Sequence, residues 1–285
     1  MERKLSMVIP KGRIFDNVIS LLREAGVDIR PNARHYVPYV GNPDIQAKII
    51  KPQNIPQLIE LGSHDVGFTG YDWIVESGAK VVELIDLGLD PVTIVAAIPN
   101  DSDLSFLRGR KIIVASEYQQ ISTNFLQREG FDFVFIRTYG ASEAFPPQDA
   151  DMIIDNRSTG QTLREHNLKA IAEIMTSSTR FIANPQALED EWKKEKIDSL
   201  AMLFKAVLNA RKRVMLEMNV PSEKLEAVVK FLPCMRAPTV APLFGDQGYA
   251  VKVAVPREDV AQLIPKLKWL GATDILEYSL RKVIT

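Results

Sequence analysis

Short apolar runs alternate with segments of helical periodicity in the first part of the chain. Residues 5–9 and 45–51 read as strands, and so does the short buried run 66–68. Between them, residues 15–24 carry apolar side chains at helical spacing and stop at Gly26. Residues 54–61 and 72–77 read as further helices. This alternation predicts an α/β fold with a parallel or mixed sheet.

A second unit of the same kind begins near Pro91. Strands are expected at 92–98, 111–115, 133–136 and 152–154, with helices at 121–129 and 163–174. A strand at 179–183 then returns toward the first unit, followed by a charged helix at 187–209. We therefore predict lobe I from residues 1–90, completed by about 180–210, and lobe II from residues 91–179. Two lobes joined by paired crossings place a ligand cleft between them.

The last part of the chain has a different order of elements. Strands at 213–220, 238–244, 249–255 and 274–283 alternate with helices that end near 231 and 270. The order βαββαβ predicts a ferredoxin-like module over residues 211–285. Appended to an enzyme, such a module is either a small-molecule sensor or a purely structural or oligomerising element.

The segment 151–162 carries the most distinctive chemistry. A short apolar strand fixes Asp155, whose carboxylate can accept hydrogen bonds from a ribose diol. Gly160 permits close backbone approach to a phosphate, which the N–H groups and hydroxyls of the turn can surround. The expected helix after the turn would present its N-terminus to the same anion. The plainer alternative is an ordinary turn in which Ser158 or Thr159 caps that helix.

Three other segments contain candidate binding residues. Lys11, Gly12 and Arg13 follow the first strand, at the edge of an α/β sheet where ligands bind. Residues 65–72 place two glycines and two carboxylates around a buried strand, and Tyr118 ends a strand of the second unit. Each also has a structural interpretation: a solvated turn, a helix N-cap at Asp72, and a rim aromatic.

Composition narrows the class of protein. The 285 residues are 46% hydrophobic and 25% charged with net charge −1, which fits a globular chain and gives no sign of a nucleic-acid binder. The single cysteine, Cys234, excludes an internal disulfide and fits a reducing compartment. No signal peptide or membrane-spanning run is visible, so we expect a cytoplasmic protein that binds neither nucleic acid nor membrane.

Taken together, these motifs resemble the long form of ATP phosphoribosyltransferase, the enzyme family that opens histidine biosynthesis. The matching segments occur in order along nearly the whole chain: residues 10–13, 65–72, 115–118, 151–163 and 237–243. The resemblance implies two catalytic lobes arranged like a periplasmic binding protein and a C-terminal, ACT-like regulatory domain that binds histidine. It also implies a homo-oligomer, a dimer that assembles into a hexamer.

The resemblance further implies transfer of the phosphoribosyl group of phosphoribosyl diphosphate to N1 of ATP, with Mg²⁺ on the diphosphate. Asp155 and Asp151 are the expected catalytic acids. Binding of phosphoribosyl diphosphate is assigned to Asp151, Asp155, Ser158, Thr159, Gly160, Gln161 and Thr162. Nucleotide binding is assigned to Lys11, Gly12, Arg13, Lys51, Asp72, Tyr118 and Glu143. Histidine binding is assigned to Asn219, Thr239, Ala254 and Asp274.

The chain departs from the family pattern in places. Asn156 and Arg157 stand where relatives usually carry apolar residues, and Lys51 where many have arginine, which replaces a bidentate contact with a point charge. Asn219 occupies a position that is acidic in some relatives. The rival interpretations are a solute-binding or effector-sensing protein on the same two-lobe fold, a different phosphoribosyltransferase, and a catalytically inactive regulatory relative.

Overall fold

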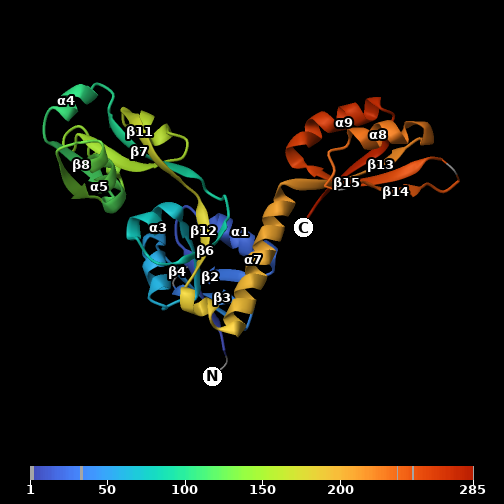
Figure 1. Cartoon of the computed structure of the whole chain (residues 1–285), viewed down its shortest axis with the longest axis horizontal. Helices are drawn as coiled ribbons and strands as arrows, with labels where there is room; N and C mark the ends of the chain where they lie inside the picture. Colours follow the sequence, from blue (N-terminus) through green and yellow to red (C-terminus); the bar gives the residue numbers. More distant parts are fainter. Residues whose placement is uncertain (1–2, 33–34, 236, 246, 285) are drawn as a thin grey trace. The chain divides into compact units, whose positions relative to one another are not determined.

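The computed structural model describes residues 3–32, 35–235, 237–245 and 247–284. The chain forms two compact units, Met1–Ala201 and Met202–Thr285 (Figure 1). The boundary between the units falls inside a long helix, α7 (Glu191–Arg211). None of the helices among the described residues is long and apolar enough to cross a membrane.

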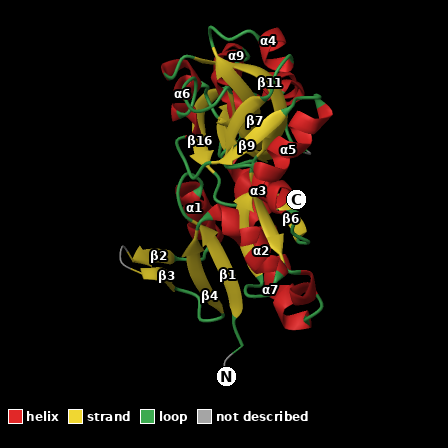
Figure 2. Ribbon diagram, turned by 90° about the vertical axis from the view of Figure 1, so that its left-hand side faces the viewer, coloured by secondary structure: helices red, strands yellow, loops and turns green. Residues whose placement is uncertain are grey.

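Lobe I of the first unit is built on a five-stranded sheet in the order β4-β1-β5-β12-β6 (Figure 2). Strand β1 pairs in parallel with β4 and with the central strand β5, whereas β12 runs antiparallel to β5 and β6. Because β12 follows lobe II in the chain, lobe I contains a strand from a later part of the sequence. The strands are β1 (Leu5–Pro10), β4 (Ile45–Ile50), β5 (Val66–Gly70), β6 (Val82–Asp86) and β12 (Thr179–Ala183). The helices are α1 (Phe15–Ala25), α2 (Ile55–Glu60) and α3 (Tyr71–Ser77).

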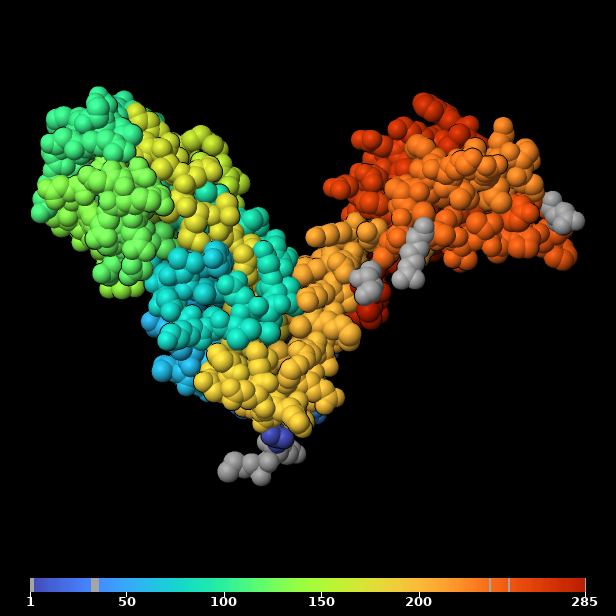
Figure 3. All heavy atoms as spheres, viewed as in Figure 1, coloured from blue at the N-terminus to red at the C-terminus, as the bar shows by residue number. Residues whose placement is uncertain are grey.

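Lobe II has a second five-stranded sheet, in the order β11-β7-β10-β8-β9. In Figure 3 the yellow atoms beside the green part of this lobe belong to the region of β11, in agreement with the pairing of β11 with β7. The strands are β7 (Val92–Pro99), β8 (Ile112–Ser116), β9 (Phe133–Arg137), β10 (Met152–Arg157) and β11 (Leu168–Ser177). The helices are α4 (Leu104–Arg108), α5 (Gln119–Arg128) and α6 (Gln161–Glu165).

The second unit is a four-stranded antiparallel sheet in the order β14-β15-β13-β16. Its elements follow one another as βαββαβ, which confirms the predicted ferredoxin-like module. Strand β13 shows why the sequence revealed it, since its residues alternate strictly between buried and half-buried positions. The elements are β13 (Arg213–Val220), α8 (Leu225–Phe231), β14 (Thr239–Pro242), β15 (Tyr249–Pro256), α9 (Val260–Trp269) and β16 (Thr273–Ser279).

The helix predicted at 163–174 is wrong. Only α6 is helical there, and Leu168–Ser177 forms the edge strand β11, paired antiparallel with β7. Two irregularities in the pairing, between Ala170 and Ala172 and between Glu173 and Met175, break the two-residue alternation of this strand. The apolar residues are consequently spaced as on a helix, and pairing with β7 decides the conformation.

The sequence also left several elements unpredicted. The hairpin of β2 (Ile29–Asn32) and β3 (His35–Val40) contains two prolines, which argue against strands. Strand β6 and the short helix α4 were missed as well. Single-turn 3₁₀ segments precede several helices or stand alone: Pro52–Asn54, Ser142–Ala144, Pro185–Leu188, Ser222–Lys224 and Arg257–Asp259.

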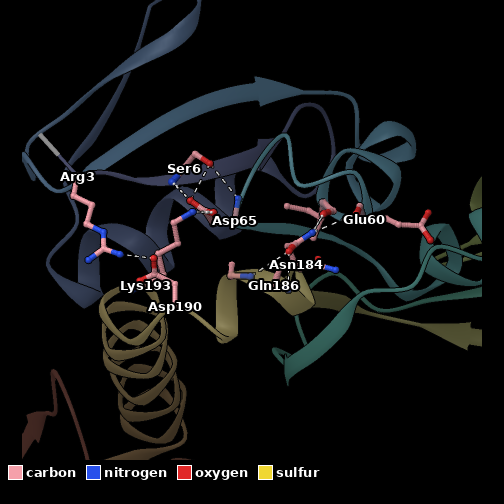
Figure 4. A network of polar contacts seen from close by, with 10 residues as sticks. Arg3, Ser6, Glu60, Asp65, Asn184, Gln186, Asp190 and Lys193 are labelled. Carbon is pink, nitrogen blue, oxygen red and sulfur yellow. Dashed lines mark hydrogen bonds and ion pairs between the residues drawn. The ribbon is translucent and has the colours of Figure 1, made fainter. Parts of the chain in front are cut away.

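A polar network fastens the start of α7 to the lobe I sheet (Figure 4). The Asp65 carboxylate accepts hydrogen bonds from the backbone N–H and the hydroxyl of Ser6, at 2.8 and 3.1 Å, and from Lys193 Nζ at 2.6 Å. Asp190 accepts from the N–H of Lys193 at 3.1 Å, as an N-cap residue does, and also pairs with Arg3. Asp65 therefore has a structural role beside β1 and β5.

Replacing Asp65 by alanine should lower the free energy of unfolding by about 2–4 kcal/mol, because it leaves a partly buried lysine and a buried serine without their acceptor. Urea unfolding followed by tryptophan fluorescence would measure the change. Asp198→Ala is the matched control on the same helix, since its ion pair with Lys194 is exposed and should contribute less than about 0.5 kcal/mol. Equal effects of the two changes would contradict the structural role of Asp65.

Candidate active site

The carboxyl ends of β1, β4 and β5 deliver charged residues to one cavity of about 400 Å³. Lys11 and Arg13 follow β1, Lys51 follows β4, and Asp72 lies in the first turn of α3 after β5. Lobe II contributes three further residues to the same cavity: Glu117, Tyr118 and Asn156. We call it the cation-lined pocket. Parallel strands end at one edge of a sheet, which is why residues distant in sequence meet here.

The three cations of this pocket are exposed and suited to phosphate oxygens. Arg13 donates to the backbone oxygen of Asp90 at 3.0 Å, which holds its side chain at the pocket. Lys11 Nζ lies 5.9 Å from the ring centroid of Tyr36, and no ion pair of Lys11 or Lys51 occurs among the described residues. Gly12, between the cations, has a φ of 92°, a conformation that glycine adopts without strain.

Asp72 and Tyr118 are buried partners across the two lobes, 2% and 1% exposed. The Tyr118 hydroxyl donates to Asp72 at 2.7 Å, and Ser177 donates to the same carboxylate at 2.6 Å. Burial and the neighbouring Asp72 raise the pKa of Tyr118, so the phenol stays protonated. Tyr118 is therefore no rim aromatic, and Asp72 does not act as an N-cap. A side chain at Gly70 would overlap the Asp72 carboxylate, which explains that glycine.

A second cavity, of about 310 Å³, lies along the turn after β10. We call it the loop pocket. Its lining includes Asp155, Ser158, Thr159, Gly160 and Thr162, so the structure brings these predicted residues together. Arg13 and Asn156 line both pockets, which are therefore adjacent.

The turn itself is shaped by Gly160, whose φ of 75° starts α6 without any side-chain cap. Thr159 Oγ1 accepts from the N–H of Gln161 only at 3.4 Å, so the hydroxyls of this turn are not committed to capping. Because α6 is only five residues long, its dipole contributes little to anion binding. The N–H and hydroxyl groups of the turn are the groups that could donate hydrogen bonds to an anion.

Asp155 is the electrostatic centre of the loop pocket. Burial raises the pKa of its carboxyl from 3.8 to about 6, against the lowering effect of hydrogen bonds from the Asn156 N–H and Ser142. The charges of Glu143 and Glu117 raise this pKa further. A carboxylate held in such surroundings is poised to stabilise positive charge that enters the pocket.

Three predicted residues are placed elsewhere. Asp151 immediately precedes β10 and lies four residues before Asp155, roughly 13 Å away at the spacing of a strand. Its carboxylate pairs with Arg110 and accepts from the N–H of Ile113 at 2.8 Å, and it lines neither pocket. The Gln161 side chain donates to Glu165 at 2.7 Å and also lines neither pocket. Glu143, expected beside the nucleotide, lines the loop pocket instead.

The second unit separates the four residues assigned to histidine. Thr239 and Ala254 line one cavity of about 660 Å³, together with Met215 and Lys252. Asn219 and Asp274 are hydrogen-bonded to each other at 2.9 Å and do not line that cavity. Asn219 is four residues from Met215 on β13, so the two positions share a face but lie apart.

Comparison with known proteins decides the family. Residues 51–206 match the family model described as ATP phosphoribosyltransferase, and residues 210–282 match the model described as HisG, C-terminal domain. The ATP phosphoribosyltransferase of Pelotomaculum thermopropionicum is 38% identical over 289 residues, with 99% of each chain covered. That of Chlorobium phaeovibrioides is 38% identical over 290 residues, covering 99% of this chain and 98% of its own. The chain belongs to the ATP phosphoribosyltransferase family.

This membership makes it a transferase of histidine biosynthesis, and it confirms the resemblance read from the motifs. A solved ATP phosphoribosyl transferase (HisG:HisZ) complex from Thermotoga maritima has a similar fold. The TM-score is 0.63 at 23% identity, over 70% of this chain and 98% of that one. The two-lobed α/β architecture predicted from the sequence is therefore confirmed.

Phosphoribosyltransferases of this kind typically use a metal ion. The carboxylates at the two pockets are of a kind that fits a hard cation. Glu117 and Glu143 each repel the Asp155 carboxylate, and oxygen ligands of this type suit a divalent cation held largely by substrate phosphates. Within the described residues, no group of three or more His, Cys, Asp or Glu could hold a metal by itself.

Several site residues escaped sequence reasoning. Glu117, Gln53, Trp73 and Asn156 line the cation-lined pocket but were not assigned to it. Glu117 adjoins the predicted Tyr118, so its position gave a usable signal. Gln53 and Trp73 reach the pocket only through folding: Gln53 donates to Glu117 at 3.4 Å, and the Trp73 ring stacks on Tyr118 at 4.5 Å between centroids.

Proposed function

We propose that the chain joins C1 of phosphoribosyl diphosphate to N1 of the adenine of ATP and releases diphosphate. The observation that carries this proposal is the pair of adjacent pockets that share Arg13 and Asn156. One pocket is lined by cations suited to polyphosphate. The other combines a turn rich in hydroxyl groups, suited to a single phosphate, with an acid suited to a ribose.

In the loop pocket, the 5-phosphate would lie against Ser158, Thr159, Thr162 and the N–H groups around Gly160. Asp155 would hold the ribose hydroxyls and stabilise the positive charge that develops on the sugar ring as the bond to diphosphate breaks. Because the leaving group is already activated, no protein nucleophile is needed. Asp151 has no part in this scheme, since its carboxylate is bound to Arg110.

In the cation-lined pocket, Lys11, Arg13 and Lys51 would bind the phosphates of ATP and the departing diphosphate. Alignment of the two substrates would supply most of the rate acceleration, because alignment alone can remove several kcal/mol from the activation barrier. Mg²⁺, bound to the diphosphate and to the nearby carboxylates, would neutralise charge on the leaving group. Asp72 and Tyr118 act indirectly, by fixing the pocket wall across the two lobes.

We also propose that L-histidine inhibits the enzyme from the second unit, in the cavity that contains Thr239 and Ala254. The Thr239 hydroxyl can donate to a carboxylate or accept from an imidazole. A dimer that assembles into a hexamer is the expected oligomer. Histidine can inhibit from there only if it binds two global states of the enzyme with different affinity.

An absorbance assay with ATP, phosphoribosyl diphosphate and Mg²⁺, followed by the same assay with added L-histidine, tests the proposed function. We expect the product of adenine N1 substitution and free diphosphate in equal amounts, and a lower rate when histidine is present. Diphosphate release without a new nucleotide product, or no reaction with both substrates saturating, would refute the proposal.

The activity should fall as the pH decreases through about 6, because Asp155 must be ionised to stabilise the sugar cation. The sign for stability is opposite: the folded pKa is raised above 3.8, so ionised Asp155 disfavours the folded state above pH 6, and this cost disappears below about 4. A pH profile of kcat/KM would measure the first effect.

Phosphate monoesters also titrate near pH 6, so the profile needs a direct control. Carbon-13 NMR of the carboxyl groups in the free enzyme, with Asp155→Asn to assign the signal, reports this pKa without substrate. A value near 4 for Asp155 would contradict the prediction.

A further inference from the structure

We propose that Asn156, which stands where relatives usually carry an apolar residue, accepts a hydrogen bond from the exocyclic amino group of the purine and so strengthens the preference of this chain for adenine. This inference deepens the proposed function and rests on it. Asn156 and Arg13 line both pockets, and Asn156 is the uncharged one of the two. The base nitrogen that attacks must reach C1 of the ribose where the pockets meet, so the amino group next to that nitrogen lies beside Asn156.

The neighbouring acid fixes the orientation of the Asn156 side chain. Its Nδ2 donates to Asp155 Oδ1 at 3.1 Å, and its backbone N–H donates to the same oxygen at 2.6 Å. An ionised carboxylate only accepts hydrogen bonds, so the amide NH₂ must face Asp155. The amide oxygen is therefore turned away from Asp155, and it accepts no hydrogen bond from the described part of the chain.

An unused amide oxygen at this place complements adenine during the reaction. As adenine N1 bonds to C1, positive charge spreads over N1, C6 and the 6-amino group, and the amino hydrogens become better donors. An oxygen that accepts from them gains strength in the transition state, when charge is present. A 6-oxo purine offers an acceptor instead of a donor at this position and would face the amide oxygen unfavourably.

The other polar groups nearby are less suited to this role. Tyr118 uses its hydroxyl hydrogen on Asp72, and Asn156 Nδ2 approaches that hydroxyl at 3.5 Å. Gln53 has a buried amide oxygen without a partner among the described residues, but it lines the cation-lined pocket and not the loop pocket. Gln53 is consequently expected to lie farther from the reacting nitrogen than Asn156.

The test compares ATP with purine riboside triphosphate, which lacks the 6-amino group but keeps N1. In Asn156→Leu we expect kcat/KM for ATP to fall about 10- to 100-fold. For the analogue we expect a fall of less than about threefold. The intrinsic difference in reactivity between the two nucleotides cancels when the same ratio is taken in the wild type and in the variant. Equal losses with both nucleotides would overturn the proposal.

Two further variants make the result specific. Asn124→Leu, the same change at an exposed position of α5, should leave both rates unchanged. Asn156→Asp retains an acceptor oxygen, so it should keep the preference for the amino group even where its overall rate is lower. If that preference disappears in Gln53→Leu and persists in Asn156→Leu, the assignment to Asn156 is wrong. Failure of the wild type to use ATP at all would refute the proposed function instead.

Discussion

Replacing Asp155 by alanine should lower kcat by roughly 10²- to 10³-fold while the chain stays folded. The carboxylate lines the loop pocket, where the ribose is proposed to lie, and its loss removes charge stabilisation that is needed only in the transition state. Steady-state kinetics with both substrates varied would measure the effect. Thr159→Ala should act on the same step more weakly, through the KM for phosphoribosyl diphosphate.

Stability provides the control for this prediction. Ionised Asp155 is desolvated and repelled by Glu117 and Glu143, so Asp155→Asn should unfold at the same temperature as the wild type or higher at pH 8. Asp132→Ala, an exposed acid of the same lobe, should change neither rate nor stability. An Asp155 variant with normal kcat would remove the acid from the mechanism, and an unfolded one would show that its role is structural.

Removing residues 212–285 should abolish inhibition by histidine and leave the transfer reaction in place. Every residue that lines the two pockets belongs to the first unit, whereas the cavity proposed for histidine belongs to the second. Inhibition curves for the truncated and full-length chains would measure the effect. A truncated chain that is still inhibited would place the histidine site in the catalytic unit.

Because truncation leaves buried residues of α7 without their surroundings, a point variant gives an independent measurement. Thr239→Ala should weaken histidine binding about tenfold, as expected for the loss of one hydrogen bond, with uninhibited activity unchanged. Asn219→Ala is the matched comparison, since Asn219 bonds Asp274 outside the cavity. If Asn219→Ala weakens binding and Thr239→Ala does not, histidine binds at that pair instead.

The predictable part of the fold came from regular periodicity. Strand β13 and helix α1 kept the spacing of two and of three to four residues, so their bounds were nearly correct. Strand β11 did not, because its irregular pairing with β7 imitates the spacing of a helix. The hairpin β2–β3 was hidden by its prolines, which are tolerated where a strand needs few ladder bonds.

The predictable part of the site came from residues next to strand ends. Lys11, Arg13 and Lys51 share one sheet edge, and Asp155 with its turn follows β10, so topology alone brings each set together. Sequence could not separate Asp155 from Asp151, since both flank the same apolar strand. Pairing with Arg110, which arrives from the loop before β8, makes the difference.

By itself, the amino-acid sequence determined the regularly spaced strands and helices, the family and the turn proposed to bind phosphate, since all of these depend on local spacing. Tertiary structure decided which carboxylates remain available for a ligand. The carboxylates of Asp65 and Asp72 accept hydrogen bonds from distant segments of the chain. The Asp155 carboxylate is instead desolvated and lies near other acids. Charge and burial at a site are sums over neighbours in space, and those neighbours are fixed only when the chain has folded.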